Sequence, residues 1–427
     1  MNELNRREAM AVGAAMAPFL ATSDASPEGQ PVGPILGHVD HETAIIWYRP
    51  LQPGEYVAVL TNVRTNETRT AKADATNGRD LCLTWRFDDL RANTEYNYAI
   101  THQGRLMAAA DNQRIRTAPS IDQSSRAVLA MGSCASSEEF FDVWTQIASQ
   151  NIDALMLLGD TPYIDDRRLP VNRLRHREFL SIPTLADLGA STPIWGTWDD
   201  HDFGGNDTDG RITGKAEIRK AFTEYRAQRS FGDGTHGVYT HFRRGPVEVF
   251  MIDTRYFSQT ESSPVDKDKP TCLGKTQWEW LCEGLKRSTA PFKLLATGMI
   301  WDDKKNREKD DWGTYAHERE ALFDFIGQNN IGGVVLIGGD IHVSRHLTYP
   351  MQERIGYDLH QFIVSPLHDR IIPSLNEPHP HLEWGEPIKN MFLTLTADST
   401  GDRPTLDARW IDRTGKLHRH VQLEAEG

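Results

Sequence analysis

The sequence predicts an α/β (α+β) protein, in which a sandwich of mixed sheets flanked by helices over residues 126–427 follows a small all-β domain over residues 33–118. Three observations support this prediction. The chain has 427 residues, a length that suits two domains and a short tail. Residues 33–118 contain short strand-like runs separated by turn residues. Beyond residue 126, apolar strands alternate with amphipathic helices.

The predicted strands of the first region begin or end near Pro, Gly or Asn. They include "TAIIWYRP", "YVAVLTNV", "LCLTWRFDDL" and "EYNYAITHQGRL". In the last of these, Tyr96 and Tyr98 follow a turn and lie two residues apart, as is typical of immunoglobulin-like and fibronectin-type sandwiches. The region holds no cluster of ligand-type residues, so we expect it to serve as a packing partner or lid for the second region.

The second region begins with buried strands and ends with strands joined by short links. The early strands are "AVLAMGSC", "IDALMLLGD", "TPIWGTWDD", "VEVFMIDTRYF", "FKLLATGMIW" and "GGVVLIGGDIH", with helices such as "KTQWEWLCEGLKRS" and "HEREALFDFIGQN" between some of them. Strands this apolar indicate a sheet covered on both faces. The last strands are "QFIVSP", "MFLTLTAD", "TLDARWID" and "LHRHVQLEA", and the turn "DRTGK" predicts an antiparallel pairing among them.

Charge and cysteine content narrow the functional classes. The net charge of −13 argues against a general nucleic-acid or anionic-membrane surface, because phosphate groups select clustered Lys and Arg. The sequence contains no stretch of 18 apolar residues, so it predicts no membrane-spanning helix. Four cysteines are too few for a disulfide scaffold, and spacing alone leaves open whether Cys272 and Cys282 pair.

The first 25 residues have the layout of an export signal. Arg6 and Arg7 precede a short Ala-rich apolar run and then small residues, an order that suggests the twin-arginine route. That route exports proteins already folded, which would suit a metalloenzyme of the periplasm or the exterior. The alternative is an ordinary amphipathic N-terminus.

Ligand-type side chains follow four of the apolar strands directly. They are Cys134, Asp160, the run from Asp199 to Asp202, and the pair Asp340 and His342. Ligands of such sheets bind beyond the carboxyl ends of the strands, so we expect these side chains to meet in one cleft. One such Asp is usually a cap or turn residue, but independent caps rarely explain four strand ends.

The stretch "TWDDHDFGGND" concentrates this pattern, with four carboxylates and a histidine in eleven residues. Carboxylates that converge repel one another unless a cation lies between them. Two-metal centres with ions about 3.5–4 Å apart stabilise the attacking and leaving oxygens of an in-line displacement. The sequence therefore predicts a metal centre suited to phosphoryl transfer.

Five blocks of the sequence together resemble a known family. "GDTPYID", "TWDDHDFGGND", "IDTRYF", "DDWGTYAHER" and "GGDIH" resemble the alkaline phosphatase D (PhoD-like) branch of the metallophosphoesterases, in order and spacing over residues 128 to about 370. The resemblance implies a metallophosphoesterase-like fold and extends to the β-rich segment before these blocks.

The resemblance also implies roles for individual residues. Asp160 looks like the carboxylate that bridges two metals, and Asp200 and Asp340 look like ligands of the second metal. A soft site would contain the Cys134 thiolate, the Tyr163 phenolate and the His342 imidazole. His201 would donate a proton to the leaving oxygen, with Asp202 orienting its ring.

The implied ligand types suggest metal identities. Thiolate, phenolate and imidazole suit a redox-capable transition metal, whereas the carboxylates at Asp200 and Asp340 favour calcium over zinc. We therefore expect Fe³⁺ in one site and one or two Ca²⁺ in the other.

The chain departs from the superfamily pattern after "FKLLATGMIW", where another His is expected and none occurs. Asp302 or Asp303 is a candidate replacement. Arg255 either holds phosphate or pairs with Asp253, the structural interpretation being favoured, and Asn206 is a candidate for positioning substrate or water.

The predicted function is a secreted, metal-dependent phosphoric-ester hydrolase that acts on a small or polymeric ester, with the ester class left open. The alternative is a metal- or phosphate-binding protein without catalysis, or a cell-surface interaction protein that uses its β-region.

Overall fold

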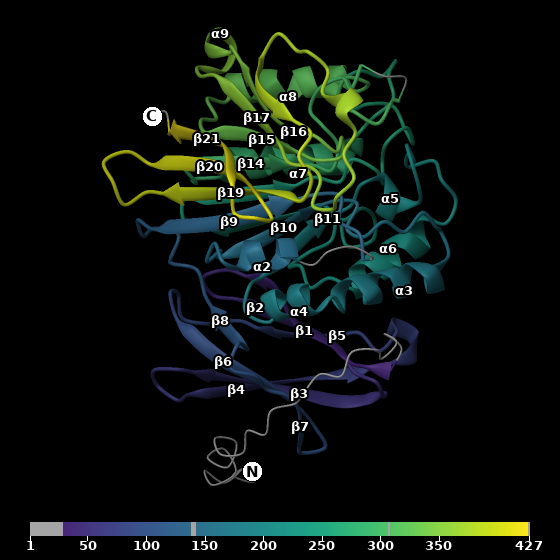
Figure 1. Cartoon of the computed structure of the whole chain (residues 1–427), viewed down its shortest axis with the longest axis vertical. Helices are drawn as coiled ribbons and strands as arrows, with labels where there is room; N and C mark the ends of the chain where they lie inside the picture. Colours follow the sequence, from purple (N-terminus) through teal and green to yellow (C-terminus); the bar gives the residue numbers. More distant parts are fainter. Residues whose placement is uncertain (1–28, 138–141, 306–307, 426–427) are drawn as a thin grey trace. The chain divides into compact units, whose positions relative to one another are not determined.

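The computed structural model describes residues 29–137, 142–305 and 308–425 (Figure 1). The predicted export segment, residues 1–25, lies outside the described residues. No helix among the described residues is long and apolar enough to cross a membrane.

Two sheets form the first part of the chain. The strands β1 (Val32–Val39), β2 (Ala44–Arg49) and β5 (Leu83–Phe87) make a three-stranded sheet. The second sheet contains β4 (Thr68–Ala75), β3 (Gly54–Asn62), β6 (Glu95–His102) and β7 (Arg105–Ala108), and β8 (Arg114–Arg116) also pairs with β6. A short 3₁₀ turn, η3, spans Asn77–Arg79. Side chains of both sheets, among them Ile46, Tyr56 and Tyr98, pack into one apolar cluster. This packing explains the alternating burial of β3, β5 and β6, whereas β1 and β2 are buried along almost their whole length.

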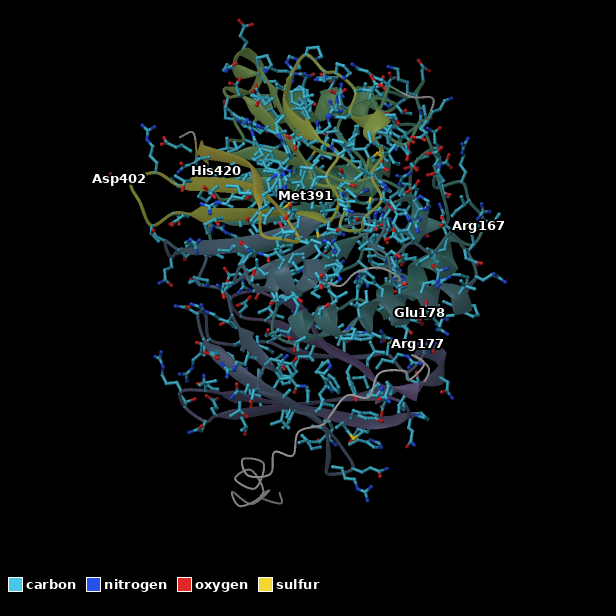
Figure 2. The ribbon with its side chains drawn as sticks, in the orientation of Figure 1. Arg167, Arg177, Glu178, Met391, Asp402 and His420 are labelled. Atoms are coloured by element: carbon cyan, nitrogen blue, oxygen red, sulfur yellow. The ribbon has the colours of Figure 1, made fainter. Side chains whose placement is uncertain are left out.

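A six-stranded sheet begins the second part. Its strands run in the order β11 (Ile194–Thr197), β10 (Ala154–Leu158), β9 (Arg126–Gly132), β19 (Met391–Asp398), β20 (Thr405–Asp412) and β21 (Leu417–Glu424). The first three are parallel, and β19, β20 and β21 pair antiparallel as the sequence predicts. In Figure 2, Asp402 in the turn after β19 projects on the opposite side of the view from Arg167, which precedes α3.

A seven-stranded sheet completes the sandwich. Its order is β12 (Thr240–Arg244), β13 (Val247–Met251), β14 (Phe292–Ala296), β15 (Val334–Gly338), β17 (Leu359–Ile363), β16 (Ser344–Tyr349) and β18 (Leu382–Glu386). The strands β13, β14, β15 and β17 are parallel, and the remaining strands pair antiparallel. The sheet is therefore mixed, as predicted.

The two large sheets pack face to face, with helices outside them (Figure 1). Within β10, Met156 lies in the cluster between the sheets and Leu157 lies in the cluster beneath the outer helices. Burial on both faces explains why these strands are apolar throughout. The helices are α2 (Asp142–Ala148), α3 (Leu169–Leu180), α4 (Pro183–Gly189), α5 (Asp200–Phe203), α6 (Lys215–Glu224), α7 (Gly274–Arg287), α8 (Ala316–Gln328) and α9 (Gln352–Ile355), with a 3₁₀ turn, η4, at Pro373–Leu375.

The β1–β8 region packs directly against the segment that follows α6. The His38 amide donates to the Ala227 carbonyl at 2.7 Å, and the Trp47 indole donates to the Glu224 carbonyl at 2.8 Å. Residues 31–427 accordingly form one compact unit. The packing role expected for this region agrees with these contacts, while its standing as a separate domain remains a prediction.

We expect Gly37→Ala to destabilise the protein, because a Cβ at this position would lie 2.0 Å from the Ala227 carbonyl oxygen. A clash between two backbones costs about 1–3 kcal/mol when neither can move freely. Urea unfolding measures the loss. Gly78→Ala is the matched control, since a Cβ there meets nothing within 4 Å. Equal stability of the two variants would contradict the proposed close contact.

Candidate metal centre

The predicted ligands lie in loops that follow strands of both large sheets. Cys134 follows β9 and Asp160 follows β10, both in the six-stranded sheet, whereas Asp340 and His342 follow β15 in the seven-stranded sheet. All four residues have left-handed backbone conformations, with φ between 53° and 67°. Non-glycine residues with left-handed backbone conformations carry strain, and they concentrate at functional sites. The loops thus turn sharply to present these side chains.

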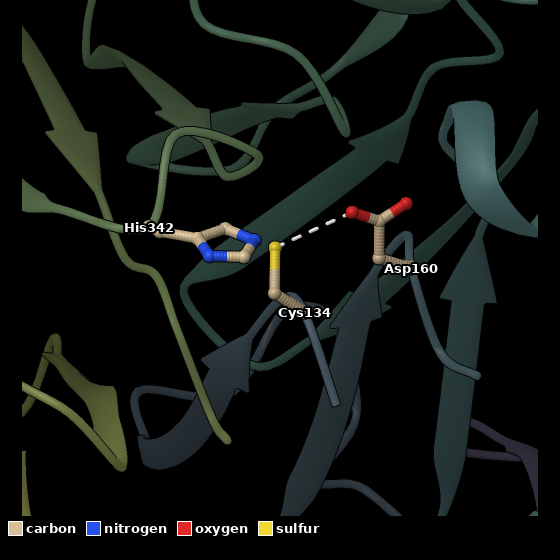
Figure 3. A group of neighbouring side chains, drawn as sticks. All are labelled: Cys134, Asp160 and His342. Carbon is tan, nitrogen blue, oxygen red and sulfur yellow. Dashed lines mark hydrogen bonds between the residues drawn. The ribbon is translucent and has the colours of Figure 1, made fainter. Parts of the chain in front are cut away.

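Cys134, Asp160 and His342 form the first group (Figure 3). Each offers one ligand atom, and these atoms lie within 4.8 Å of one another. The Cys134 thiol donates to Asp160 Oδ2 at 3.4 Å, and the Tyr163 hydroxyl lies 2.8 Å from His342 Nε2. The three side chains expected in a soft site therefore lie together with Asp160.

Carboxylates form the groups beside it. Asp160 and Asp200 lie with Asp199 and Asp340 in one group and with His201 in another, and Asp200 also lies with Asp207 and Asp310. Asp160 belongs to three of the four groups in all. A carboxylate in that position could contact two cations at once, and the bridging role stays a prediction.

Burial and mutual repulsion raise the pKa values of several of these acidic groups. Burial first, and then repulsion by Asp200, raise the pKa of Asp160 well above its usual range. Burial also raises the pKa of Asp340 to about 7, although Lys304 opposes the shift. Burial and the Asp160 charge raise the pKa of the Cys134 thiol. A cation among these groups would favour their ionised forms.

The residues present fit one or more metal ions. The six aspartates of the groups face two buried cationic side chains, those of Arg255 and Lys304. Among the described residues, Asp199 Oδ2 is buried without a hydrogen-bond partner, although the other oxygen of that carboxylate accepts from Arg255. Buried anionic oxygens in this number normally coordinate a metal or pair with a cation.

His201 has a different partner from the one predicted. Its Nδ1 donates to Asp165 Oδ1 at 2.6 Å, whereas Asp202 accepts from the Asp199 amide at 2.5 Å and from the Thr161 amide at 3.4 Å. Asp202 is needed to cap the short helix α5, so it does not orient the ring. Burial is the largest single influence and lowers the pKa of His201, but the Asp165 hydrogen bond and the nearby carboxylate charges, Asp200 first, together raise the pKa above its ordinary value.

Arg255 does not make the predicted side-chain pair with Asp253, and its contact with phosphate stays a prediction. Its guanidinium is buried and pairs with Asp199 and Asp310, while only its backbone amide donates to Asp253. Asn206 is exposed in the turn after α5. The candidate replacements also lie elsewhere: Asp302 pairs with Arg319 and His379, and Asp303 accepts from the Lys305 amide. Cys272 and Cys282 are both free thiols.

Comparison with known proteins places the chain in a family. Residues 129–386 match the family described as PhoD-like phosphatase. The chain belongs to this family. Alkaline phosphatase D from Bacillus subtilis (strain 168) is 25% identical over 308 residues, which cover 60% of this chain and 52% of that protein. The chain thus spans about half the length of this curated relative.

Two solved structures share the fold. A structure of PhoD superimposes with a TM-score of 0.77 at 18% identity, covering 96% of this chain and 92% of the other. The purple acid phosphatase PPD1 from yellow lupin (Lupinus luteus) seeds superimposes with a TM-score of 0.67 at 11% identity, covering 92% and 74%. These likenesses establish mixed sheets flanked by helices as the fold of this PhoD-like phosphatase.

The structure adds residues that the sequence interpretation missed. His368 follows β17, and its Nε2 lies 3.3 Å from the Tyr163 hydroxyl. Asp310 is the first residue of the "DDWGTYAHER" block, and Asp165 is the last residue of the "GDTPYID" block. Both blocks carried the family signal, but only folding shows that their acids reach Asp200 and His201.

In metal-free protein, we expect the stability difference between wild type and Asp202→Asn to depend on pH. Burial raises the pKa of Asp202 to about 7 from an ordinary 3.8. A raised acid pKa means that the folded state binds the proton more tightly, so wild-type stability falls as pH rises between about 4 and 7. The asparagine side chain does not titrate.

Urea unfolding in chelator at several pH values from 5 to 8 measures this difference. The wild type should lose up to about 1.4 kcal/mol per pH unit relative to the variant, and the difference should level off above pH 7. A difference that is constant across this range would show that Asp202 has an ordinary pKa.

Proposed function

We propose that this PhoD-like phosphatase is a metal-dependent phosphoric-ester hydrolase with a dinuclear centre. The observation that carries the proposal is the overlap of the ligand groups, since Asp160 and Asp200 each belong to groups that can hold different ions. Bound cations at this position would supply charge neutralisation for the phosphoryl group and acidify the attacking water. A protein that only binds phosphate does not require a hydrogen-bonded His–Asp pair beside such groups.

The two sides of the centre favour different metals. Cys134, Tyr163 and His342, with Asp160, provide soft and redox-compatible donors that suit Fe³⁺. Asp200 and Asp340, together with Asp199, provide oxygen donors that suit one or two Ca²⁺.

His201 is the proposed general acid. Its Nδ1 bond to Asp165 fixes the ring and leaves Nε2 as the nitrogen available to the leaving oxygen. The His201 amide donates to Asp200 Oδ1 at 2.9 Å, so the same residue connects the acid to a metal-binding carboxylate. We assign Arg255 a positioning role, because its buried guanidinium holds Asp199 and Asp310.

A polar cavity borders the carboxylate side. It has a volume of about 390 Å³, and its lining includes Asp207, Asp310, Arg255, Gln259, Thr314 and Tyr315. This space can accept the organic group of an ester, and its hydroxyl and amide groups favour a polar one. Comparing rates on nitrophenyl phosphate and bis-nitrophenyl phosphate distinguishes monoester from diester preference.

Export through the twin-arginine route is part of the proposal. It rests on Arg6 and Arg7 and on the small-residue run that follows them. A periplasmic or secreted location would supply calcium at concentrations that carboxylate sites can use.

We expect metal analysis of protein made without added zinc to find iron and calcium. Cys134→Ser should lose most of the iron and keep calcium, because a hydroxyl is a poor substitute for a thiolate. Elemental analysis of both proteins measures this. Cys282→Ser is the control, since that thiol lies in α7 away from the groups. Two zinc ions and no iron would contradict the assignment.

We expect His201→Ala to lower kcat by about 10²–10⁴ with metal content unchanged, because proton donation to the leaving oxygen is lost. Steady-state rates on both nitrophenyl esters measure the effect. His420→Ala is the control, as His420 pairs with Asp407 between β20 and β21, outside the centre and the cavity. Unchanged hydrolysis would remove His201 from the mechanism and favour a binding protein without catalysis.

A further inference from the structure

Lys304 reaches the metal centre from the loop after β14, near the point where the family resemblance predicts a histidine and none occurs. Its Nζ lies 2.5 Å from Asp340 Oδ2, 2.8 Å from Asp310 Oδ1 and 3.5 Å from Glu308 Oε2. The side chain is only 3% exposed. An ammonium group thus lies where a neutral metal ligand is expected.

The backbone of Lys304 is also fixed. Its amide donates to Asp311 Oδ2 at 2.8 Å, and the other oxygen of Asp311 accepts from the Thr314 amide at 2.9 Å. The first bond joins Lys304 to the turn before α8, and the second lies within that turn. The lysine is therefore directed into the centre by its main chain, while its four-carbon stem allows the ammonium group to move.

The two principal partners of Lys304 belong to different carboxylate groups. Asp340 lies with Asp160, Asp199 and Asp200, whereas Asp310 lies with Asp200 and Asp207. A single ammonium group between them neutralises charge in both. An ammonium has three donors and no lone pair, so it cannot itself coordinate a metal and can only repel one.

Arg255, the other buried cation, is held differently. Its Nε donates to Asp199 at 2.6 Å, its Nη1 to the Thr208 carbonyl at 3.3 Å and its Nη2 to Asp310 at 3.3 Å. Hydrogen bonds on three nitrogens of a planar group fix it in place. Lys304 is the cation that can withdraw.

We propose that Lys304 is a tethered counter-cation that competes with a divalent ion for Asp310 and Asp340, and so sets the affinity of the carboxylate side for metal. The inference rests on the proposed function, since it concerns the calcium side of that centre. A divalent ion that takes Asp340 Oδ2 must either displace Nζ or bind against its charge. With the ion absent, Lys304 holds the two carboxylates together and limits their repulsion.

Calcium binding to the full-length, iron-loaded protein tests this. Calcium is removed with a chelator, and calorimetric titration then gives Kd for wild type, Lys304→Met and Lys304→Arg. We expect Lys304→Met to bind calcium about tenfold more tightly or better, because the competing charge is gone. Lys304→Arg keeps the charge and should stay near wild type. Lys305→Met is the matched control, because the Lys305 Nζ donates to the Pro378 carbonyl at 3.1 Å and belongs to none of the carboxylate groups.

The possible results separate the counter-cation role of Lys304 from the calcium assignment. An unchanged or weaker Kd in Lys304→Met, or equal tightening in the Met and Arg variants, would overturn the counter-cation role and leave the calcium assignment standing. Absence of calcium binding in every variant, with iron retained, would overturn the calcium assignment and this inference together. Should Lys304→Met lose its near-ultraviolet circular dichroism, Lys304→Gln replaces it with the same expectation.

Discussion

The convergence of buried carboxylates on one point is the constraint on which the rest of this structure depends. Asp160, Asp199, Asp200 and Asp340 place ligand oxygens within 4.8 Å of one another, and no arrangement of backbone amides alone compensates so much charge. Arg255 and Lys304 neutralise part of this negative charge, and bound cations would neutralise the rest. The sharp loop turns, the capped helix α5 and the buried ion pairs all follow from holding these groups together.

The sandwich makes such convergence feasible. Parallel strands within one sheet bring their carboxyl ends to one edge, but one sheet supplies ligands along a line. Here β9, β10 and β11 come from one sheet and β15 from the other, and the shared apolar cluster between the sheets fixes their distance. Ligands therefore approach from two sides. Gly339, which follows β15, shows how close this approach is, since a Cβ there would lie 2.5 Å from Oγ of Ser133, which follows β9.

Much of this arrangement could be predicted because it is encoded locally. Apolar strands followed by Cys134, Asp160 or His342 identify both the sheets and the edge at which ligands gather, and these residues do meet. Partners fixed by loop packing could not be predicted. Sequence proximity suggested Asp202 as the partner of His201, but capping of α5 engages Asp202, and Asp165 comes from another loop. Lys304 was missed for the same reason, since a lysine in a polar loop normally faces solvent.

The two sides of the centre differ in how they can respond to a change of charge. On the soft side, Tyr163 contacts both His342 and His368, and burial raises the pKa of Tyr163 and lowers that of His342, so both side chains favour their neutral forms. On the carboxylate side, charged groups are already compensated in part by Arg255 and Lys304. Asp160 belongs to both sides. A cation bound on one side therefore changes the field on the other through this carboxylate, and the order in which the two sides fill should depend on it.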